Sequence, residues 1–431
     1  MRHSSTKQLL HMIKLVRHLF FTLILTILAC RAFAQPGSIS ISGKVTALND
    51  GHPIVQASIS ISRKGVGTAT NAAGMFVLII PANNLGDTLK ISCVGFKTKQ
   101  LPIASLTNKA ELNLALENNN TELKEVTIAY YDAVKIIEKA ISRIPDNYIN
   151  HPHILRGFYR MYTYSGQAPL QLSEAVFDVY NFGYADKHAD LFKLIKARNE
   201  KNERDFNAVE LGQKPNSVFE DDIINHINAC GFLNNEGLTK HRFEVKGIVD
   251  FKGYEAYQID FKEKTPELEG TFRGSIYIET KTYAFIHFDF GLSPFALGDL
   301  SSWNFISRAL MKMGDVKIDL EKNHAQVSYQ MVGNKWALLS MQSNDVLAIE
   351  NTSAHTHLPA NVKFNYQVTA VDTVEKAPFS SKLGRNENIN NYDGSVGEKF
   401  WKDYNILLSD YNTEDIFKQI QEINKAIKKA K

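Results

Sequence analysis

SGKV (residues 42–45) opens the stretch that decides the fold, which continues as PIVQASISI (53–61), GVGTATNAAGMFVLIIP (65–81) and DTLKISCVGF (87–96). Its apolar residues alternate with polar ones, which is the period of half-buried β-strands. The alternating positions are Ile39, Ile41, Val45, Ala57, Ile59, Ile61, Phe76, Leu78, Ile80, Leu89, Ile91, Cys93, Leu112, Leu114 and Leu116. Turn residues separate the runs, with Lys64, Gly65 and Gly67 in one turn and Asn71 and Gly74 in another. Short strands with turns at this spacing predict a β-sandwich.

This stretch resembles the carboxypeptidase regulatory-like domain, a small transthyretin-like β-sandwich of bacterial envelope proteins, above all of Bacteroidetes. The family's short motifs occur here in the same order and at the same spacing. The resemblance implies a seven-stranded-type sandwich over residues 35–120. It implies no peptidase activity, because the family is named after an accessory domain.

The first 34 residues have the composition of a signal peptide. A basic region precedes a short apolar run at 19–29, and Ala32-Phe33-Ala34 is a small-x-small site, so we expect cleavage between Ala34 and Gln35. The run is shorter than the roughly 20 apolar residues that a spanning helix needs, which favours export over anchoring. An alternative is a lipoprotein acylated at Cys30, because residues 27–30 loosely resemble a lipobox.

Cleavage of this leader changes the sign of the net charge. The chain has 49 Lys and Arg against 46 Asp and Glu, and five basic but no acidic residues lie in the leader, so the mature chain carries −2. Without an excess of basic residues, the sequence does not predict the positively charged surface that nucleic-acid-binding proteins use. No later apolar run is long enough for a transmembrane helix. We therefore expect an exported protein, in the periplasm or associated with the outer membrane.

A polar break at 118–121 separates the sandwich from residues 121–431, which we expect to form a β-rich domain with helices at both ends. Asp132 is a candidate cap for a first helix that ends at Pro145. Its expected apolar face is Val134, Ile137, Ile141 and Ile144, and that of the last helix is Ile416, Ile420, Ile423 and Ile427.

Between these helices the pattern is largely β. Hairpins are expected at 243–261, 272–290 and 327–339, and another strand at 362–368. The strand pairs resemble the curved half-barrel sheet of periplasmic lipoprotein carriers. A further resemblance covers most of the chain and is to uncharacterised Bacteroidetes envelope proteins. It rests on four features that occur together: the sandwich, the helix at 133–148, and the segments LRGFYRMYTYS (155–165) and FWKDYNIL (400–407). The predicted fold class is thus mainly β with α elements. A sandwich is followed by an antiparallel α+β domain, and a half-barrel is one shape that the sheet of this domain could take.

No motif predicts a catalytic, cofactor-binding or metal-binding site. His241 and Glu244 have a spacing that metal sites use, but on a strand they point to opposite faces. Several other features have a plainer interpretation. His151, His153, His355 and His357 are assigned to loops, residues 65–67 to a turn, 220–222 to the start of a helix, 193–204 to a solvated charged face, and Trp303, Trp336 and Trp401 to the core.

These observations favour a non-catalytic envelope protein whose β-rich domain binds a partner protein or an apolar or glycan ligand. Two alternatives stay open. One is a hydrolase whose catalytic carboxylates are scattered over loops, and the other is an accessory subunit of an outer-membrane transport complex.

Overall fold

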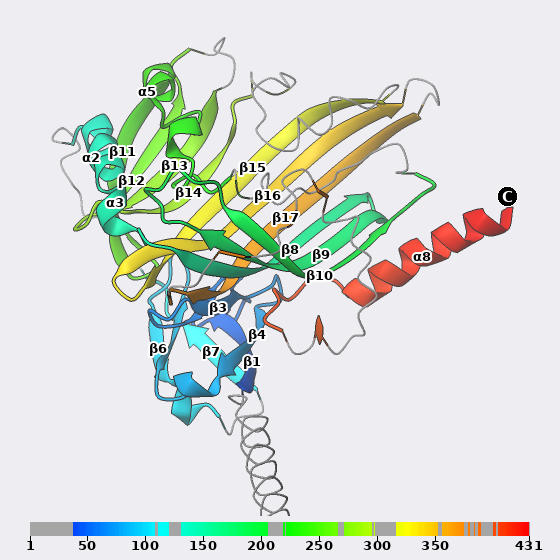
Figure 1. Cartoon of the computed structure of the whole chain (residues 1–431), viewed down its shortest axis with the longest axis horizontal. Helices are drawn as coiled ribbons and strands as arrows, with labels where there is room; N and C mark the ends of the chain where they lie inside the picture. Colours follow the sequence, from blue (N-terminus) through cyan, green and yellow to red (C-terminus); the bar gives the residue numbers. More distant parts are fainter. Residues whose placement is uncertain are drawn as a thin grey trace, which may run out of the picture.

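The chain forms two β-rich parts in a computed structural model (Figure 1). The structure describes residues 38–107, 111–119, 131–205, 219, 221–265, 271–294, 297, 316–351, 356–374, 378–379, 383, 387–388, 400–401 and 404–430. The expected cleavage site at Ala34 and Gln35 and the expected boundary between residues 120 and 121 lie outside these ranges, as do Trp303 and His355.

The first part is a sandwich of seven strands in two sheets. One sheet has the order β4-β1-β7 and the other β3-β2-β5-β6. The strands are β1 (Ser38–Ala47), β2 (Ser58–Ile61), β3 (Val66–Ala69), β4 (Met75–Pro81), β5 (Thr88–Ser92), β6 (Lys99–Pro102) and β7 (Leu112–Leu116). The alternating apolar residues pack between the sheets, as expected.

The turn after β2 is shorter than expected. Arg63 and Gly65 have positive φ angles of 58° and 68°, and the chain enters β3 at Val66. The placement of Gly67 in the turn was therefore wrong. Gly67 pairs with Ser60, and a Cβ there would lie 2.9 Å from the Ile59 carbonyl oxygen.

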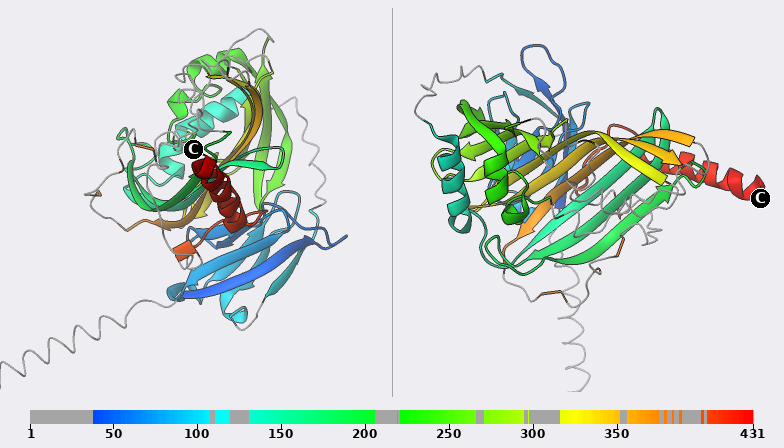
Figure 2. Two further views of the ribbon diagram at one scale, coloured as in Figure 1. Left: turned by 90° about the vertical axis from the view of Figure 1, so that its right-hand side faces the viewer. Right: turned by 90° about the horizontal axis from the view of Figure 1, so that it is seen from above.

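The second part is one antiparallel sheet with the order β10-β9-β8-β17-β16-β15-β14-β13-β12-β11. Its strands are β8 (His153–Ser165), β9 (Ala168–Asn181), β10 (Leu191–Lys201), β11 (His241–Phe251), β12 (Tyr254–Glu263), β13 (Phe272–Glu279), β14 (Phe285–Leu292), β15 (Val316–Val332), β16 (Lys335–Asn351) and β17 (Thr356–Asp372). Figure 2 shows that this sheet curves. Its end strands β10 and β11 do not pair, so the sheet stays open, and the predicted fold class is confirmed.

Two helices follow the sandwich and pack in the core of the curved sheet. The Asp132 side chain caps α2 (Ala133–Ser142) by accepting from the backbone N–H of Val134 at 3.1 Å. The buried face of α2 is Ala133, Ile136, Ile137 and Ala140. Of the predicted stripe, Ile137 and Ile144 are buried, whereas Val134 and Ile141 are only half-buried. Pro145 does not end α2 directly but lies in the first turn of α3 (Ile144–Asn147), where its missing N–H has no helical partner to lose.

The expected helix after residues 220–222 was also wrong. His226 donates to the Asp222 carbonyl at 3.0 Å, which closes a single turn. The chain continues through the short 3₁₀ helix η4 (Ile227–Ala229) to α5 (Asn235–Lys240). Asp222 is turned into the core, where its carboxylate accepts from the Tyr329 hydroxyl at 2.6 Å.

A C-terminal strap, defined here as residues 404–412, connects the two parts before α8 (Thr413–Ala430). Within the strap, the Asn405 side chain accepts from the Ile79 N–H at 2.6 Å and donates to the Ile79 carbonyl at 2.9 Å. Leu407 packs in a small cluster with Ala69 of the sandwich and Phe158 of the curved sheet. α8 packs on β9 and β10 and then extends beyond the body of the molecule (Figure 1).

Candidate functional site

A pocket of about 250 Å³ lies between the sandwich and the curved sheet. It is bounded by the outer face of β2, β5 and β6 on one side, and by the β11–β12 hairpin and the ends of β15 and β16 on the other. Pockets for drug-sized ligands are about 300–1,000 Å³, so this pocket suits a smaller ligand or one headgroup.

The sandwich wall of the pocket is built by strand register. Ser60, Lys90 and Gln100 lie directly opposite one another on β2, β5 and β6. Ser58 and Ser92 form the next row. These five residues share one face because side chains two positions apart on a strand point the same way. The residues between them point to the sandwich core.

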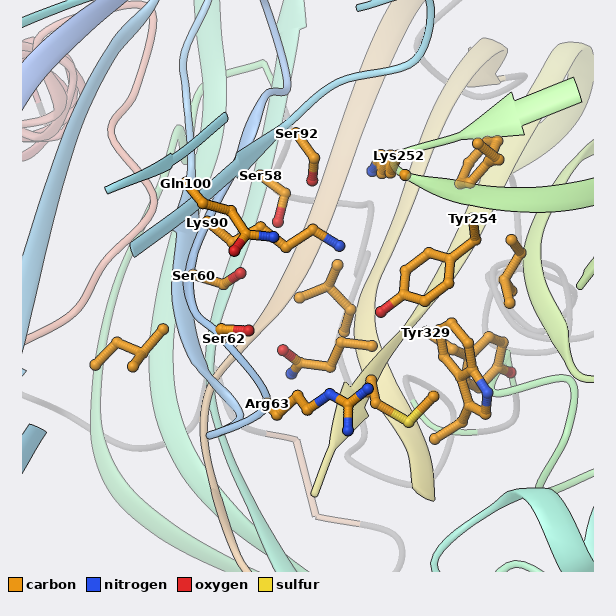
Figure 3. A pocket seen from close by; sticks show the side chains of 18 residues that line it. Ser58, Ser60, Ser62, Arg63, Lys90, Ser92, Gln100, Lys252, Tyr254 and Tyr329 are labelled. Carbon is orange, nitrogen blue, oxygen red and sulfur yellow. The ribbon is translucent and has the colours of Figure 1, made fainter. Parts of the chain in front are cut away.

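The opposite wall begins at the turn of the β11–β12 hairpin. Lys252 and Gly253 have φ angles of 53° and 85°, as a two-residue type I′ turn requires. The ring of Tyr254 packs on Trp336, with 5.0 Å between the centroids. The Lys90 Nζ lies 4.4 Å from the Tyr254 ring centroid and joins the two walls. Figure 3 shows the Lys90 amine and the Tyr254 hydroxyl pointing into the same space.

Close backbone approaches hold the two walls together. The Gly333 N–H donates to the Arg63 carbonyl at 2.8 Å. A Cβ on Gly253 would lie 2.7 Å from the Thr98 Oγ1, so the hairpin turn meets the sandwich where only glycine fits. Gly65 is equally restricted, because its Cβ would lie 2.7 Å from a β17 side chain. The pocket is therefore formed before any ligand binds.

The pocket is strongly cationic. Arg63, Lys90 and Lys252 line it, and no Asp or Glu does so among the described residues. Burial lowers the pKa of Lys90, and the charges of Lys252 and Arg63 lower it further, while Asp250 acts in the opposite direction. Burial also lowers the pKa of Lys252. Burial is the main cause of both shifts, since it disfavours the charged form of an amine.

Comparison with known proteins identifies the sandwich. Residues 41–128 match the CarboxypepD_reg-like domain. The regulatory-like domain predicted from the motifs is thus confirmed, over about a fifth of the chain. No curated protein has a sequence significantly similar to this chain.

Two solved structures are similar to the chain at low levels. A DUF1329 family protein from Desulfovibrio piger is 11% identical, with 57% of this chain and 96% of that chain covered and a TM-score of 0.23. A LolA superfamily protein from Nitrosomonas europaea is 8% identical, with 57% and 96% covered and a TM-score of 0.24. At these identities and TM-scores, the likeness carries no inference about function.

The residues weighed as metal ligands have structural roles. Buried His241 bonds the Gly237 carbonyl through Nδ1 at 2.8 Å and the Phe272 N–H through Nε2 at 2.9 Å, whereas Glu244 is exposed. The assignment of His153 and His357 to loops was wrong, because they lie on β8 and β17. His153 is buried, which lowers its pKa to about 4. Within the described ranges, no group of three His, Cys, Asp or Glu side chains could hold a metal ion.

The sequence did not predict the surroundings of two carboxylates beside the curved sheet, buried Asp222 and half-buried Asp190. Burial raises the pKa of Asp222 to about 6, and burial together with the Asp222 charge raises that of Asp190 to about 8. Asp190 accepts from the side-chain amides of Asn181 at 3.0 Å and Asn225 at 3.1 Å. Both acids thus have hydrogen-bond partners from the protein and do not line the pocket.

The assignment of residues 193–204 to a solvated face holds for Lys193, Glu203 and Arg204, which are exposed, but not for the half-buried charges between them. Most of this stretch is β10, and Arg198 is only 14% exposed. Arg198 donates to Glu174 at 2.6 Å, and Arg160 donates to the other oxygen of the same carboxylate at 2.6 Å. The expectation for Trp336 and Trp401 was right, because both are buried.

Sequence reasoning also missed the pocket itself. The available signal was the run of serines at 58, 60 and 62, which alternate with core isoleucines and so share the outer face of β2. Serines are common on the solvent-exposed face of a strand. Only the position of the curved sheet opposite these serines shows that they line a pocket. In the part of the chain that the structure describes, no helix is both long and apolar enough to cross a membrane.

Proposed function

We propose that this chain is a non-catalytic, exported protein of the bacterial cell envelope that binds a small ligand in the pocket between its regulatory-like domain and its curved sheet. The signal-peptide composition of the leader supports export. The regulatory-like domain supports an envelope setting.

The observation that carries this proposal is a preformed pocket with buried polar groups. Ser58 and Ser92 are 8% and 4% exposed, and both line the pocket. The indole N–H of Trp336 is buried and has no partner in the same part of the chain. Buried polar groups are usually paired, so this indole N–H at the pocket favours a ligand that pairs it.

The chemistry of the pocket supports binding over catalysis. A serine nucleophile needs a base within hydrogen-bond reach, and the described lining contains no His, Asp or Glu. The nearby His287 is engaged with the Ser328 hydroxyl at 2.7 Å, and burial lowers its pKa to about 3. The pocket thus has no His, Asp or Glu to activate a serine, which leaves Lys90 and Lys252 as candidate bases in the described lining.

Native mass spectrometry of the protein extracted from its own envelope tests the proposal. We expect a retained small molecule in the wild-type protein and its loss in Ser60→Trp, whose indole would fill the pocket. The matched control is Thr413→Trp at the start of α8, which should retain the ligand. Equal retention in Ser60→Trp would contradict the proposal, as would hydrolysis of peptides or glycosides that is lost when one acid or histidine is changed.

A further inference from the structure

We infer that the ligand of this pocket carries an anionic group, a phosphate or a carboxylate, which binds between Lys90 and Lys252 beside the serine hydroxyls. The inference rests on the proposed function, because it concerns the same pocket. It goes further by giving the chemistry of the ligand.

The charge distribution is the first argument. Three cationic side chains line the pocket from three segments: the β2–β3 turn, β5 and the β11–β12 hairpin. None of them forms an ion pair within the described residues, although many other lysines and arginines of this chain do. Figure 3 shows Lys252 and Arg63 at opposite ends of the pocket with Lys90 between them. Like charges held together favour a bound anion, because it removes their repulsion.

The hydroxyl groups are the second argument. Ser58 and Ser92 lie in the row beside Lys90 and can donate to anionic oxygens. Hydrogen bonds in which the donor or the acceptor is charged are roughly twice as strong as those between neutral groups. Serines beside lysines therefore suit an oxyanion better than a neutral group.

The strand register provides a sharp test. Ser60 lies directly opposite Lys90, and side chains in such pairs have Cβ atoms about 4.5–5.5 Å apart. In Ser60→Asp the new carboxylate would reach the Lys90 ammonium and take the place of the ligand's anionic group. Ser60→Asn has almost the same shape without the charge and is the matched control.

The full chain is titrated by calorimetry at low salt with inorganic phosphate, with glucuronate and with glucose, the neutral counterpart of glucuronate. We expect phosphate and glucuronate to bind, glucuronate at least tenfold tighter than glucose, and both more weakly as salt rises. Ser60→Asp should weaken anion binding at least tenfold, and Ser60→Asn less than threefold. Lys90→Gln should also weaken it about tenfold, whereas Lys418→Gln on exposed α8 should have no effect.

Each outcome separates this inference from the proposed function. Equal binding of glucose and glucuronate, or equal anion binding by Ser60→Asp and Ser60→Asn, would overturn the anion inference alone. The anion inference would also be overturned if the ligand retained from the envelope were neutral and were absent from Ser60→Trp. If anions bind and Lys90→Gln weakens them while Ser60→Trp still retains the envelope ligand, the anion site stands and the proposed function fails. Thermal melts of the variants exclude loss of folding as the cause.

Discussion

At the scale of single residues, the outer face of the curved sheet depends on the Glu174 carboxylate. Its side chain is fully buried and lies between the guanidinium groups of Arg160 and Arg198, each 2.6 Å away. Arg198 also bonds Glu414 of α8, and Arg160 donates to the Leu407 carbonyl of the strap at 2.9 Å. One acid thus links three strands, β8, β9 and β10, with the strap and α8.

Replacing Glu174 by Gln keeps the shape and removes the charge. Buried Arg160 would then lose its carboxylate partner and Arg198 would keep only Glu414, and breaking a buried charge cluster in this way costs roughly 3–5 kcal/mol. We expect the free energy of unfolding, measured by chemical denaturation, to fall by that amount. Glu138→Gln on the exposed side of α2 should change it by less than about 0.5 kcal/mol. A loss below about 1 kcal/mol at Glu174 would contradict this account.

At the scale of elements, the sequence predicts strands that have one core face and one solvent face. The hairpins at 243–261 and 272–290 show this alternation and were confirmed as β11 to β14. β9 is buried on both faces along nearly its whole length. The alternation of polar and apolar residues in its sequence therefore does not show that its polar side chains are buried. The burial of Glu174 and of the charged residues of β10 follows from the strap and α8, which cover them in the folded structure and which the sequence pattern does not place there. The same limit hid the pocket, because its two walls are 150 or more residues apart in the sequence.

The strap protects an edge strand of the sandwich. β4 lies at the edge of its sheet, and the Asn405 side chain imitates a neighbouring strand by bonding both the N–H and the carbonyl of Ile79. We expect Asn405→Leu to lower the free energy of unfolding by about 1–3 kcal/mol, from two lost hydrogen bonds. Hydrogen exchange at the Ile79 amide should become faster. Asn113→Leu, at an exposed position of β7, is the control, and unchanged exchange at Ile79 in Asn405→Leu would refute the role of the strap.

At the scale of the whole molecule, the two parts share an interface but have separate cores. The core of the sandwich consists of residues between 39 and 116, and within the described ranges Ala370 is the one partly buried residue of the curved sheet that packs against it. The second core spans residues from Ala133 to Leu383. The strap and the pocket walls join the two parts over their outer surfaces, where polar groups predominate.

We therefore predict that residues 35–120 fold alone. A unit of this size buries only about 60% of its unfolded surface, so its stability should lie at the low end of roughly 5–15 kcal/mol. It should melt cooperatively with β-type circular dichroism, at a lower temperature than the sandwich within the full chain, because Ala69 and the edge of β4 lose their cover. An unfolded fragment would mean that the strap and the curved sheet complete the sandwich core. The pocket would then be an internal feature of one cooperative unit, and ligand binding would stabilise both parts equally.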